Sequence, residues 1–373
     1  MHTKKICIAF LGNAFNDSRI TNLTNSLKED GCKVSVISFD WFIKKQNIIS
    51  DEIKVFKLNK GRFSVFFYIH FAFILVRELI KSNADIYFAE DFYTLPFVAV
   101  IAKLKNGKVY YNSRELYAYI GGLRNRPFIQ AIIRLIEKYF IKKVDLVLTT
   151  GEMDSKFLED YYKIKNTLVI RNIPLYQKPE NIFDFRKKYN IPKNSLILLY
   201  QGVLLEGRGI PIIIKSLREL PDTYFILLGE GEQKNNFIKL AEQLNVNERV
   251  IFAGVYEQNE LINYTAGADI GLAIIENISI SYYHALPNKL FEYIMAGLPV
   301  IVSNLPQMKN IVETYKVGEV VDIDKGESIV PIIMKWKNNP KLIDEFRKNC
   351  FNAAKELNWQ EEYKRVKNVL LNF

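Results

Sequence analysis

Cysteine is scarce in this sequence. The 373 residues include three cysteines, Cys7, Cys32 and Cys350, which lie far apart. With no C-x-x-C pair, the sequence favours neither a zinc knuckle nor a disulfide framework. Asp322 and Asp324 form a D-x-D pair of the kind that can hold a metal ion, but they follow a late apolar run, and no other cluster has ligand spacing. We therefore expect no metal and no other cofactor.

A hydrophobic run long enough to cross a bilayer is also missing. A spanning helix needs about 20 apolar residues, whereas the most apolar stretch, Phe63–Val76, is shorter, contains His70 and is followed by Arg77 and Glu78. We interpret it as a buried helix of an α/β domain. The start, MHTKKICIAFLG, passes from a basic patch into an apolar strand without a signal-peptide cleavage region. This pattern favours a cytoplasmic location.

Two binding fingerprints are absent as well. A dinucleotide-binding dehydrogenase carries G-x-G-x-x-G after its first strand, and neither FLGNAFND nor GEGEQ completes that pattern. The net charge of +10, from 51 basic and 41 acidic residues, favours anionic partners. Because no nucleic-acid recognition motif accompanies this charge, phosphate groups and anionic membrane surfaces are the partners that it favours.

The length and the pattern of the chain predict two α/β domains. Domains typically have about 100–200 residues, and 49% of this chain is apolar, enough for two cores. Short apolar runs alternate with helical segments, which implies parallel sheets with ligands beyond the carboxyl ends of the strands. The predicted strands are 5–12, 33–40, 84–91, 108–116, 144–151, 167–174, 195–202, 223–231, 249–254, 269–275, 298–303 and 317–322. The predicted helices of the first half are 20–30, 63–81, 95–104 and 128–142.

Glycine-bearing loops follow the strands of the second half. Gly202, Gly229 and Gly254 each end an apolar run, where a glycine lets the backbone approach a ligand. In the loop after Gly202, Arg208 stands between two more glycines. A guanidinium there can make a two-pronged contact with phosphate. The alternative is a surface arginine in a flexible loop.

A helix start at Pro287 concentrates polar residues. Asn288 and Glu292 share one face of this helix, and Lys289 lies in its first turn beside exposed backbone N–H groups. An anion at this point would meet free amides, the positive end of the helix dipole and a lysine. Glu292, one turn deeper, is placed to accept two ribose hydroxyls. The alternative is an ordinary α/β helix with solvated polar residues.

These segments together resemble a known enzyme family. The landmarks occur in order: DSRI, ADIYFAEDFYTLP, KVYYNSREL and VIRNIP in the first half, then QGVLLEGRG, FILLGEGEQ, RVIFAGVYEQNEL, YTAGADIGLA, PNKLFEYIMAGLPVIVS and VGEVVD. Over nearly its whole length the chain resembles the retaining "group 1" glycosyltransferases of family 4. The resemblance implies an α/β fold of GT-B type, with two Rossmann-like, doubly wound domains that face a central cleft.

The resemblance also implies how the chain is divided and what it does. Residues 1–175 would form the acceptor-side domain, 176–194 a linker, 195–355 the nucleotide-sugar-binding domain, and 356–373 a helix that packs back on the first domain. The implied activity is a metal-independent, hexosyltransferase-like transfer with retention of configuration. The sugar would pass from a nucleotide-diphosphate sugar to a glycan or lipid-linked acceptor, in the biosynthesis of a surface polysaccharide.

The site residues follow from the same resemblance. Arg208 and Lys289 would contact the donor diphosphate, and Glu292, as the second glutamate of the family's E-x7-E motif, would bind the ribose. These three are the predicted catalytic residues. The predicted donor-binding residues are Gly12, Gly202, Gly229, Glu230, Val255, Tyr256, His284, Asn288 and Leu290. The predicted acceptor-side or sugar-contacting residues are Asp17, Arg19, Asp91, Arg114 and Glu115.

The sequence departs from the family pattern at two positions. His284 stands where the first glutamate of E-x7-E normally helps to hold the sugar, and it has either a donor-site or a structural role. Arg114, followed by Glu115, stands where a histidine commonly touches the donor sugar, and an arginine there can instead meet a phosphate. These departures keep a second hypothesis open: a non-catalytic glycosyltransferase-like subunit that binds a nucleotide sugar or glycan.

A basic segment at Arg124–Lys143 points to a membrane. Six basic residues and one acid are interleaved with apolar residues at roughly helical spacing. Such a helix can lie on an anionic membrane face, and the predicted location is then the inner face of the cell membrane. The alternative is a packed helix with a solvated basic side. No nucleic-acid partner is expected.

Overall fold

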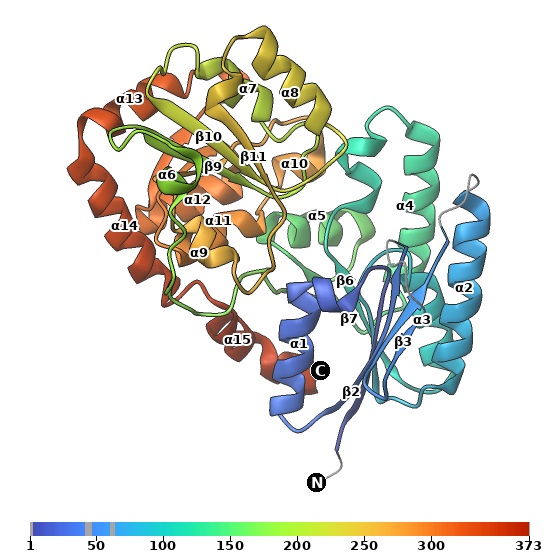
Figure 1. Cartoon of the computed structure of the whole chain (residues 1–373). Helices are drawn as coiled ribbons and strands as arrows, with labels where there is room; N and C mark the ends of the chain where they lie inside the picture. The colour runs from blue at the N-terminus through green and yellow to red at the C-terminus, as the bar shows by residue number, and fades with distance from the viewer. Residues whose placement is uncertain (1–2, 42–46, 60–63, 373) are drawn as a thin grey trace. The chain divides into compact units, whose positions relative to one another are not determined.

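The computed structural model describes residues 3–41, 47–59 and 64–372, which form two compact units (Figure 1). The first unit is Met1–Arg171 with Glu362–Phe373, and the second is Asn172–Glu361. Residues 176–194, for which the sequence suggests a linker, lie in the second unit. Phe185 of this stretch is fully buried, and its ring packs on Tyr264, so an aromatic contact holds the segment against the rest of the second unit.

The first unit is built on an eight-stranded sheet. Its strands are β1 (Lys5–Phe10), β2 (Lys33–Asp40), β3 (Ile48–Ile49), β4 (Ile53–Lys57), β5 (Ile86–Ala89), β6 (Lys108–Ser113), β7 (Leu146–Thr149) and β8 (Thr167–Val169). Their order is β3-β4-β2-β1-β5-β6-β7-β8. All neighbouring pairs are parallel except β3 and β4, two short strands that the sequence pattern did not predict. The parallel order agrees with the predicted alternation of strands and helices.

Helices cover both faces of this sheet. They are α1 (Ser18–Glu29), α2 (Ser64–Lys81), α3 (Leu95–Leu104), α4 (Pro127–Ile141), α5 (Glu152–Tyr162) and most of α15 (Trp359–Asn372). The part of α15 in the first unit is held by Glu362, which is fully buried and accepts three hydrogen bonds from Arg171 at 2.6–3.0 Å. Tyr110 of β6 donates to the carbonyl of Leu370 at 3.2 Å, so the last turns of the chain are tied to the sheet of the first unit.

Helix α2 differs in part from its predicted burial. The sequence suggested a buried helix from Phe63, a residue that lies outside the described part of the chain. Inner residues such as Leu75 are buried, but Phe66 and Phe73 are 70% and 66% exposed. The predicted burial is therefore confirmed for the side of the helix that packs on the core, whereas the opposite side is exposed.

The second unit contains a six-stranded, wholly parallel sheet. Its strands are β9 (Leu196–Gln201), β10 (Thr223–Leu228), β11 (Val250–Gly254), β12 (Ile270–Ala273), β13 (Val300–Ser303) and β14 (Gly318–Val321), in the order β11-β10-β9-β12-β13-β14. Its helices are α6 (Phe185–Tyr189), α7 (Ile210–Ser216), α8 (Lys234–Gln243), α9 (Leu261–Thr265), α10 (Ile280–Tyr283), α11 (Asn288–Met295), α12 (Pro306–Tyr315), α13 (Val330–Asn338) and α14 (Pro340–Ala354). Every strand predicted for this half is present.

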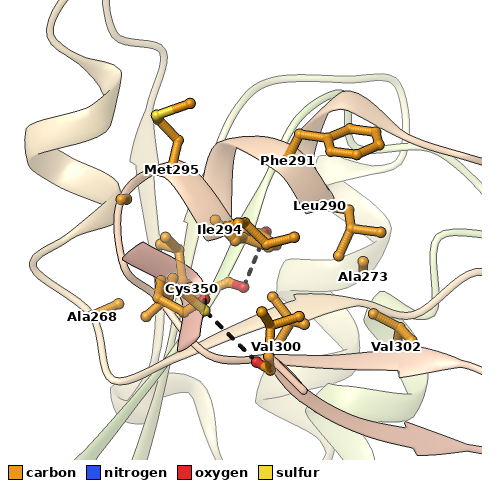
Figure 2. Packing of buried hydrophobic residues seen from close by; sticks show 14 of the residues in the cluster. Ala268, Ala273, Leu290, Phe291, Ile294, Met295, Val300, Val302 and Cys350 are labelled. Atoms are coloured by element: carbon orange, nitrogen blue, oxygen red, sulfur yellow. Dashed lines mark hydrogen bonds between the residues drawn. The ribbon is translucent and has the colours of Figure 1, made fainter. Parts of the chain in front are cut away.

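A hydrophobic core fixes the position of α11. Figure 2 shows Leu290, Ile294 and Met295 of this helix among buried side chains from the neighbouring strands, including Val300 of β13. The buried thiol of Cys350, on α14, donates to the carbonyl of Leu298 at 3.6 Å. Because α11 is anchored along its length, its first turn is held rigidly against the edge of the sheet.

Within the part of the chain that the structure describes, no helix is both long and apolar enough to span a bilayer.

Candidate functional site

Three glycine turns lie side by side at the carboxyl edge of the second sheet. Gly202 and Gly229 follow β9 and β10, Gly254 is the last residue of β11, and the three have φ of 126°, 150° and 87°. Backbone hydrogen bonds join the turns: Gly229 N–H donates to the Gly254 carbonyl at 2.7 Å. A Cβ on Gly229 would lie 2.0 Å from the carbonyl oxygen of Gly202. Only glycine permits this backbone conformation and spacing, which leaves the backbone of the edge accessible to a ligand.

Lys289 lies in the first turn of α11 and faces this edge. Its side chain is buried, and its Nζ lies 3.5 Å above the centroid of the Tyr200 ring. The Tyr200 hydroxyl donates to the Val203 carbonyl at 2.8 Å, which holds the ring in place. A Cβ on Gly202 would lie 3.6 Å from Nζ, so the ammonium group sits against the glycine turn.

Arg208 supplies a second positive charge near Lys289. It is half-buried, between Gly207 and Gly209, and its guanidinium lies 4.7 Å from the centroid of the Tyr282 ring. Burial, and then the charge of Arg208, lower the pKa of Lys289 well below its ordinary value. Among the described residues, neither cation has a carboxylate within ion-pair distance. Two neighbouring cations that are held by aromatic rings and lack an anion form a site for an anionic ligand.

Glu292 lies one turn further along α11 and is held by amide side chains. Its carboxylate accepts hydrogen bonds from Gln201, the last residue of β9, and from Gln258 at 3.2 Å. The side-chain oxygen Oε1 of Gln201 accepts from the Thr265 hydroxyl at 2.8 Å. Burial raises the pKa of Glu292, while the two amides and Lys289 oppose the rise. The carboxylate is therefore fixed in orientation, with hydrogen-bonding capacity left for hydroxyl groups.

A small hollow of about 20 Å³ opens beside this carboxylate. All its lining residues belong to the second unit: Pro174, Gln177, Gln258, Leu261, Ile262, Thr265, Glu292 and Met295. Apolar side chains supply part of the wall, and Glu292 with Gln258 supplies a polar end. This space is about that of one water molecule, and its polar end lies at the carboxylate that Gln201 and Gln258 orient.

The other predicted donor-binding residues of this unit lie in different environments. Tyr256 packs on Tyr264, with ring centroids 3.8 Å apart, and Val255 beside it is largely exposed. Glu230 pairs with Lys234 at 2.6 Å on the surface. Asn288 is exposed at the start of α11.

Two further predicted donor-binding residues, His284 and Leu290, make contacts within the second unit. His284 is buried, and its carbonyl accepts a hydrogen bond from Gln307. The side chain of Leu290 is fully buried in the core, and its backbone N–H donates to the Pro287 carbonyl at 3.0 Å. The structure thus places Leu290 beneath the site rather than at its surface.

In the first unit, predicted residues gather in a buried, charge-balanced cluster. Arg114 pairs with Asp17 at 2.6 Å and with Glu90 at 2.9 Å. The side-chain amide of Asn112 donates to Glu90 at 2.8 Å. The side-chain oxygen of the same Asn112 accepts from Arg19 at 2.9 Å. Burial, and then Arg114, lower the pKa of Arg19 to about 10, and one of its terminal nitrogens, Nη1, is buried without a partner. Arg114 is thus committed to two carboxylates, unlike the cations of the second unit.

The remaining predicted residues of the first unit are partly structural. The carboxylate of Asp91 accepts from the N–H of Leu11 at 2.6 Å and of Thr94 at 2.8 Å, so it joins the turn after β1 to the start of α3. Glu115 is exposed. The carbonyl of Gly12 accepts from Phe39 at 3.0 Å, which fixes the turn after β1 against β2.

The described residues contain no group of three or more potential His, Cys, Asp or Glu ligands that could hold a metal ion. Asp322 of the D-x-D pair caps a short turn: it accepts from Asn304 at 2.8 Å and pairs with Lys325 at 3.2 Å. The expectation of no metal remains a prediction.

The sequence did not identify several residues around Lys289 and Glu292 in the second unit, or around Arg114 in the first. In the second unit these are Tyr200, Gln201, Gln258 and Thr265, and in the first they are Glu90 and Asn112. Most of them lie at or just beyond strand ends. That position was the one available signal, because ligands of parallel sheets bind there.

Two Rossmann-like units, each with a largely parallel sheet, define the GT-B class of glycosyltransferase folds. Residues 181–357 match the model of the family "Glycosyl transferases group 1", and residues 18–173 match that of "Glycosyltransferase Family 4". Together the two matches cover most of the chain and confirm the resemblance drawn from the sequence. The chain belongs to the group 1 glycosyltransferases.

Known proteins are similar to this chain in sequence and in fold. It is 27% identical over 220 residues to an uncharacterised glycosyltransferase of Methanocaldococcus jannaschii, a match that covers 55% of this chain and 52% of the relative. It therefore spans about half the length of that relative. A putative teichuronic acid biosynthesis glycosyltransferase of Bacillus subtilis, TuaH, is 24% identical, with 86% of this chain and 82% of TuaH covered. Anabaena HepE, solved in complex with UDP and glucose, has a similar fold, with a TM-score of 0.73, 14% identity and coverage of 99% of this chain and 100% of HepE.

Proposed function

We propose that the protein transfers a sugar from a nucleotide-diphosphate sugar to a glycan or lipid-linked acceptor, with retention of configuration and without a metal ion. The observation that carries this proposal is the cation pair, Lys289 and Arg208, which lies at the carboxyl edge of the second sheet without a carboxylate partner among the described residues. Glu292, held by two amide side chains, lies one helical turn from Lys289 on α11. Diphosphate and ribose are the two groups that this combination suits.

The reaction requires that charge on the leaving group be stabilised. The bond between the anomeric carbon and the diphosphate oxygen breaks, and a bond from the acceptor hydroxyl oxygen to the same carbon forms. In the proposed front-face attack, the hydroxyl proton passes to the departing phosphate oxygen. Negative charge grows on the diphosphate as the sugar acquires oxocarbenium character, so preorganised cations at Lys289 and Arg208 stabilise the transition state more than the ground state.

The donor class has support from a similar fold. HepE was solved with UDP and glucose, and TuaH carries a name that refers to teichuronic acid biosynthesis. We accordingly propose a nucleoside diphosphate as leaving group and a surface polysaccharide as the final product. The proposed location is the cytoplasm at the inner face of the cell membrane, where a lipid-linked acceptor would be presented.

The decisive experiment measures donor-dependent release of nucleoside diphosphate across a panel of nucleotide sugars. Donors are first selected by thermal shift, because a ligand that binds the folded state raises its apparent stability. The anomeric configuration of the product is then read by NMR. Donor binding without release in the presence of varied acceptors would instead favour the non-catalytic subunit, and an inverted product would contradict retention.

Glu292→Gln should weaken the binding of nucleotide sugar and of free nucleoside diphosphate alike. If the carboxylate holds the ribose, the variant loses hydrogen bonds to a charged group, which corresponds to about 10–100-fold in dissociation constant. Calorimetry measures both ligands. Glu313→Gln, a change of the same kind at the exposed position paired with Lys309 on α12, serves as control. Unchanged nucleotide affinity in Glu292→Gln would assign that residue a structural role.

Turnover should survive chelation. Lys289 and Arg208 supply the positive charge that a divalent cation would otherwise bring to the diphosphate. We expect the same initial rate after treatment with EDTA as before it. Loss of activity in EDTA, followed by recovery with magnesium or manganese but not with calcium, would overturn the metal-independent mechanism.

A further inference from the structure

We infer that the outer side of α2, α3 and α4 is a membrane-docking face that inserts apolar side chains among anionic lipids. This surface, called here the outer helical face, deepens the proposed location of the protein. It does not depend on the transfer reaction, because docking on a membrane needs no donor.

Three helices build the outer helical face. Helix α3 contacts both α2 and α4, and all three pack on the first sheet through one core (Figure 1). Their outward side chains include six large apolar groups with 60–79% of their surface exposed: Phe66, Phe73, Leu104, Phe128, Leu135 and Tyr139. Single exposed apolar residues are ordinary, but a layer of them on adjacent helices marks an interaction surface.

The spacing of these residues gives α2 and α4 an outward apolar stripe. Phe66 and Phe73 are seven residues apart on α2, and Phe128, Leu135 and Tyr139 lie along one side of α4. Residues at intervals of three, four or seven share a helix face. A helix whose outward stripe is apolar can lie in the plane of a bilayer interface, with that stripe among the acyl chains.

The charged residues of the three helices favour binding to an anionic membrane. Within α2, α3 and α4 the two acidic residues are Glu78 and Glu137, and both are buried. Glu137 faces inward and accepts from the hydroxyls of Tyr111 and Tyr162, both at 2.7 Å. Glu78 is paired with Lys54 at 2.9 Å. The exposed side of these described helices therefore presents no carboxylate.

Basic residues lie among the outward apolar groups. Lys138 and Lys142 are exposed at the end of α4, and the Nζ of Lys143 lies 3.6 Å from the centroid of the Tyr139 ring. An apolar surface with lysines and without exposed carboxylates is complementary to acyl chains beneath anionic headgroups. A second copy of the chain would bring the same positive charge to the contact, which disfavours self-association through this face.

Co-sedimentation with vesicles tests the docking face. The purified full chain, without donor, is mixed with phosphatidylcholine vesicles that contain or lack phosphatidylglycerol. We expect binding to the anionic vesicles, with a weaker but measurable fraction bound at high salt. Raising the salt from 0.1 M to 1 M shortens the Debye length from about 10 Å to about 3 Å, whereas the apolar contribution remains. Phe73→Asp and Leu135→Asp should each reduce the partition coefficient by about tenfold or more.

A matched control separates insertion from general surface charge. Ile182→Asp introduces the same change at an exposed apolar position of the second unit and should bind as the wild type does. Melting temperatures show that the variants fold, and donor-dependent release of nucleoside diphosphate without vesicles shows whether the proposed activity is intact. Wild-type vesicle binding in Phe73→Asp and Leu135→Asp would overturn the inference. So would a dimer in solution that Leu135→Asp dissociates, because the face would then be covered by a second copy.

Discussion

Lys289→Ala and Arg208→Ala should each lower the turnover number by about 10²–10³, the usual cost of removing one preorganised group that stabilises transition-state charge. Both cations are held in place before any ligand binds, Lys289 above Tyr200 and Arg208 beside Tyr282. The full electrostatic benefit is thus available at the moment of bond cleavage. Steady-state kinetics with saturating donor measures the effect.

The control is Lys215→Ala, at an exposed lysine near the far end of α7, which should retain wild-type turnover.

Stability provides a second check. Lys289 is a buried cation without an anionic partner among the described residues, and such a charge costs free energy in the folded state. Lys289→Met should therefore melt at the same temperature as the wild type or higher, while its activity falls. Wild-type turnover in folded Lys289→Ala and Arg208→Ala would refute the site.

The sequence was sufficient to predict the framework of this site. The apolar runs that end at Gln201, Leu228 and Gly254 are strands of one parallel sheet, as their pattern indicated. The segment after Pro287 is a helix whose first turn carries Lys289. Both predictions depend on local signals: the length of an apolar run, a glycine after it, and a proline at a helix start.

The hydrogen bonds around Glu292 could not be predicted in the same way. Gln201, Gln258 and Thr265 come from a strand end, a loop and a helix end, and they meet only because β9 lies at the centre of the sheet next to α9 and α11. Amide and hydroxyl side chains are common on protein surfaces, so nothing in their local sequence distinguishes these three. Their role depends on contacts between residues up to 91 positions apart.

The predicted burial of α2 holds for only one side of the helix, for a different reason. Hydrophobicity shows that a segment avoids water, but it does not show which side of a helix the core covers. Leu75 and Leu79 face the core, whereas Phe66 and Phe73 do not. Conversely, the charged Glu137 is buried, because two tyrosine hydroxyls satisfy its carboxylate. In both helices the tertiary environment, rather than residue type, decides which side is exposed.

The affinity for nucleoside diphosphate should fall as pH rises, and binding should take up a proton. In the free protein, burial and then the charge of Arg208 lower the pKa of Lys289, so the neutral amine is populated at a lower pH than usual. A bound diphosphate favours the ammonium form and raises the same pKa. Between the two pKa values the affinity therefore decreases by up to about tenfold per pH unit. Below the pKa that Lys289 has in the free protein, the affinity for nucleoside diphosphate does not depend on the titration of Lys289.

Calorimetry in two buffers of different ionisation enthalpy measures the number of protons taken up. The experiment is run well above pH 6, because the terminal phosphate itself titrates at about that value. Lys289→Met supplies the matched comparison: it keeps Arg208, Glu292 and the ligand, so any proton uptake that persists in it has another source. We expect uptake in the wild type that rises with pH and is absent from Lys289→Met. Equal uptake in both proteins, or a wild-type affinity that does not change as the pH is raised, would show that Lys289 is already fully charged before the diphosphate binds.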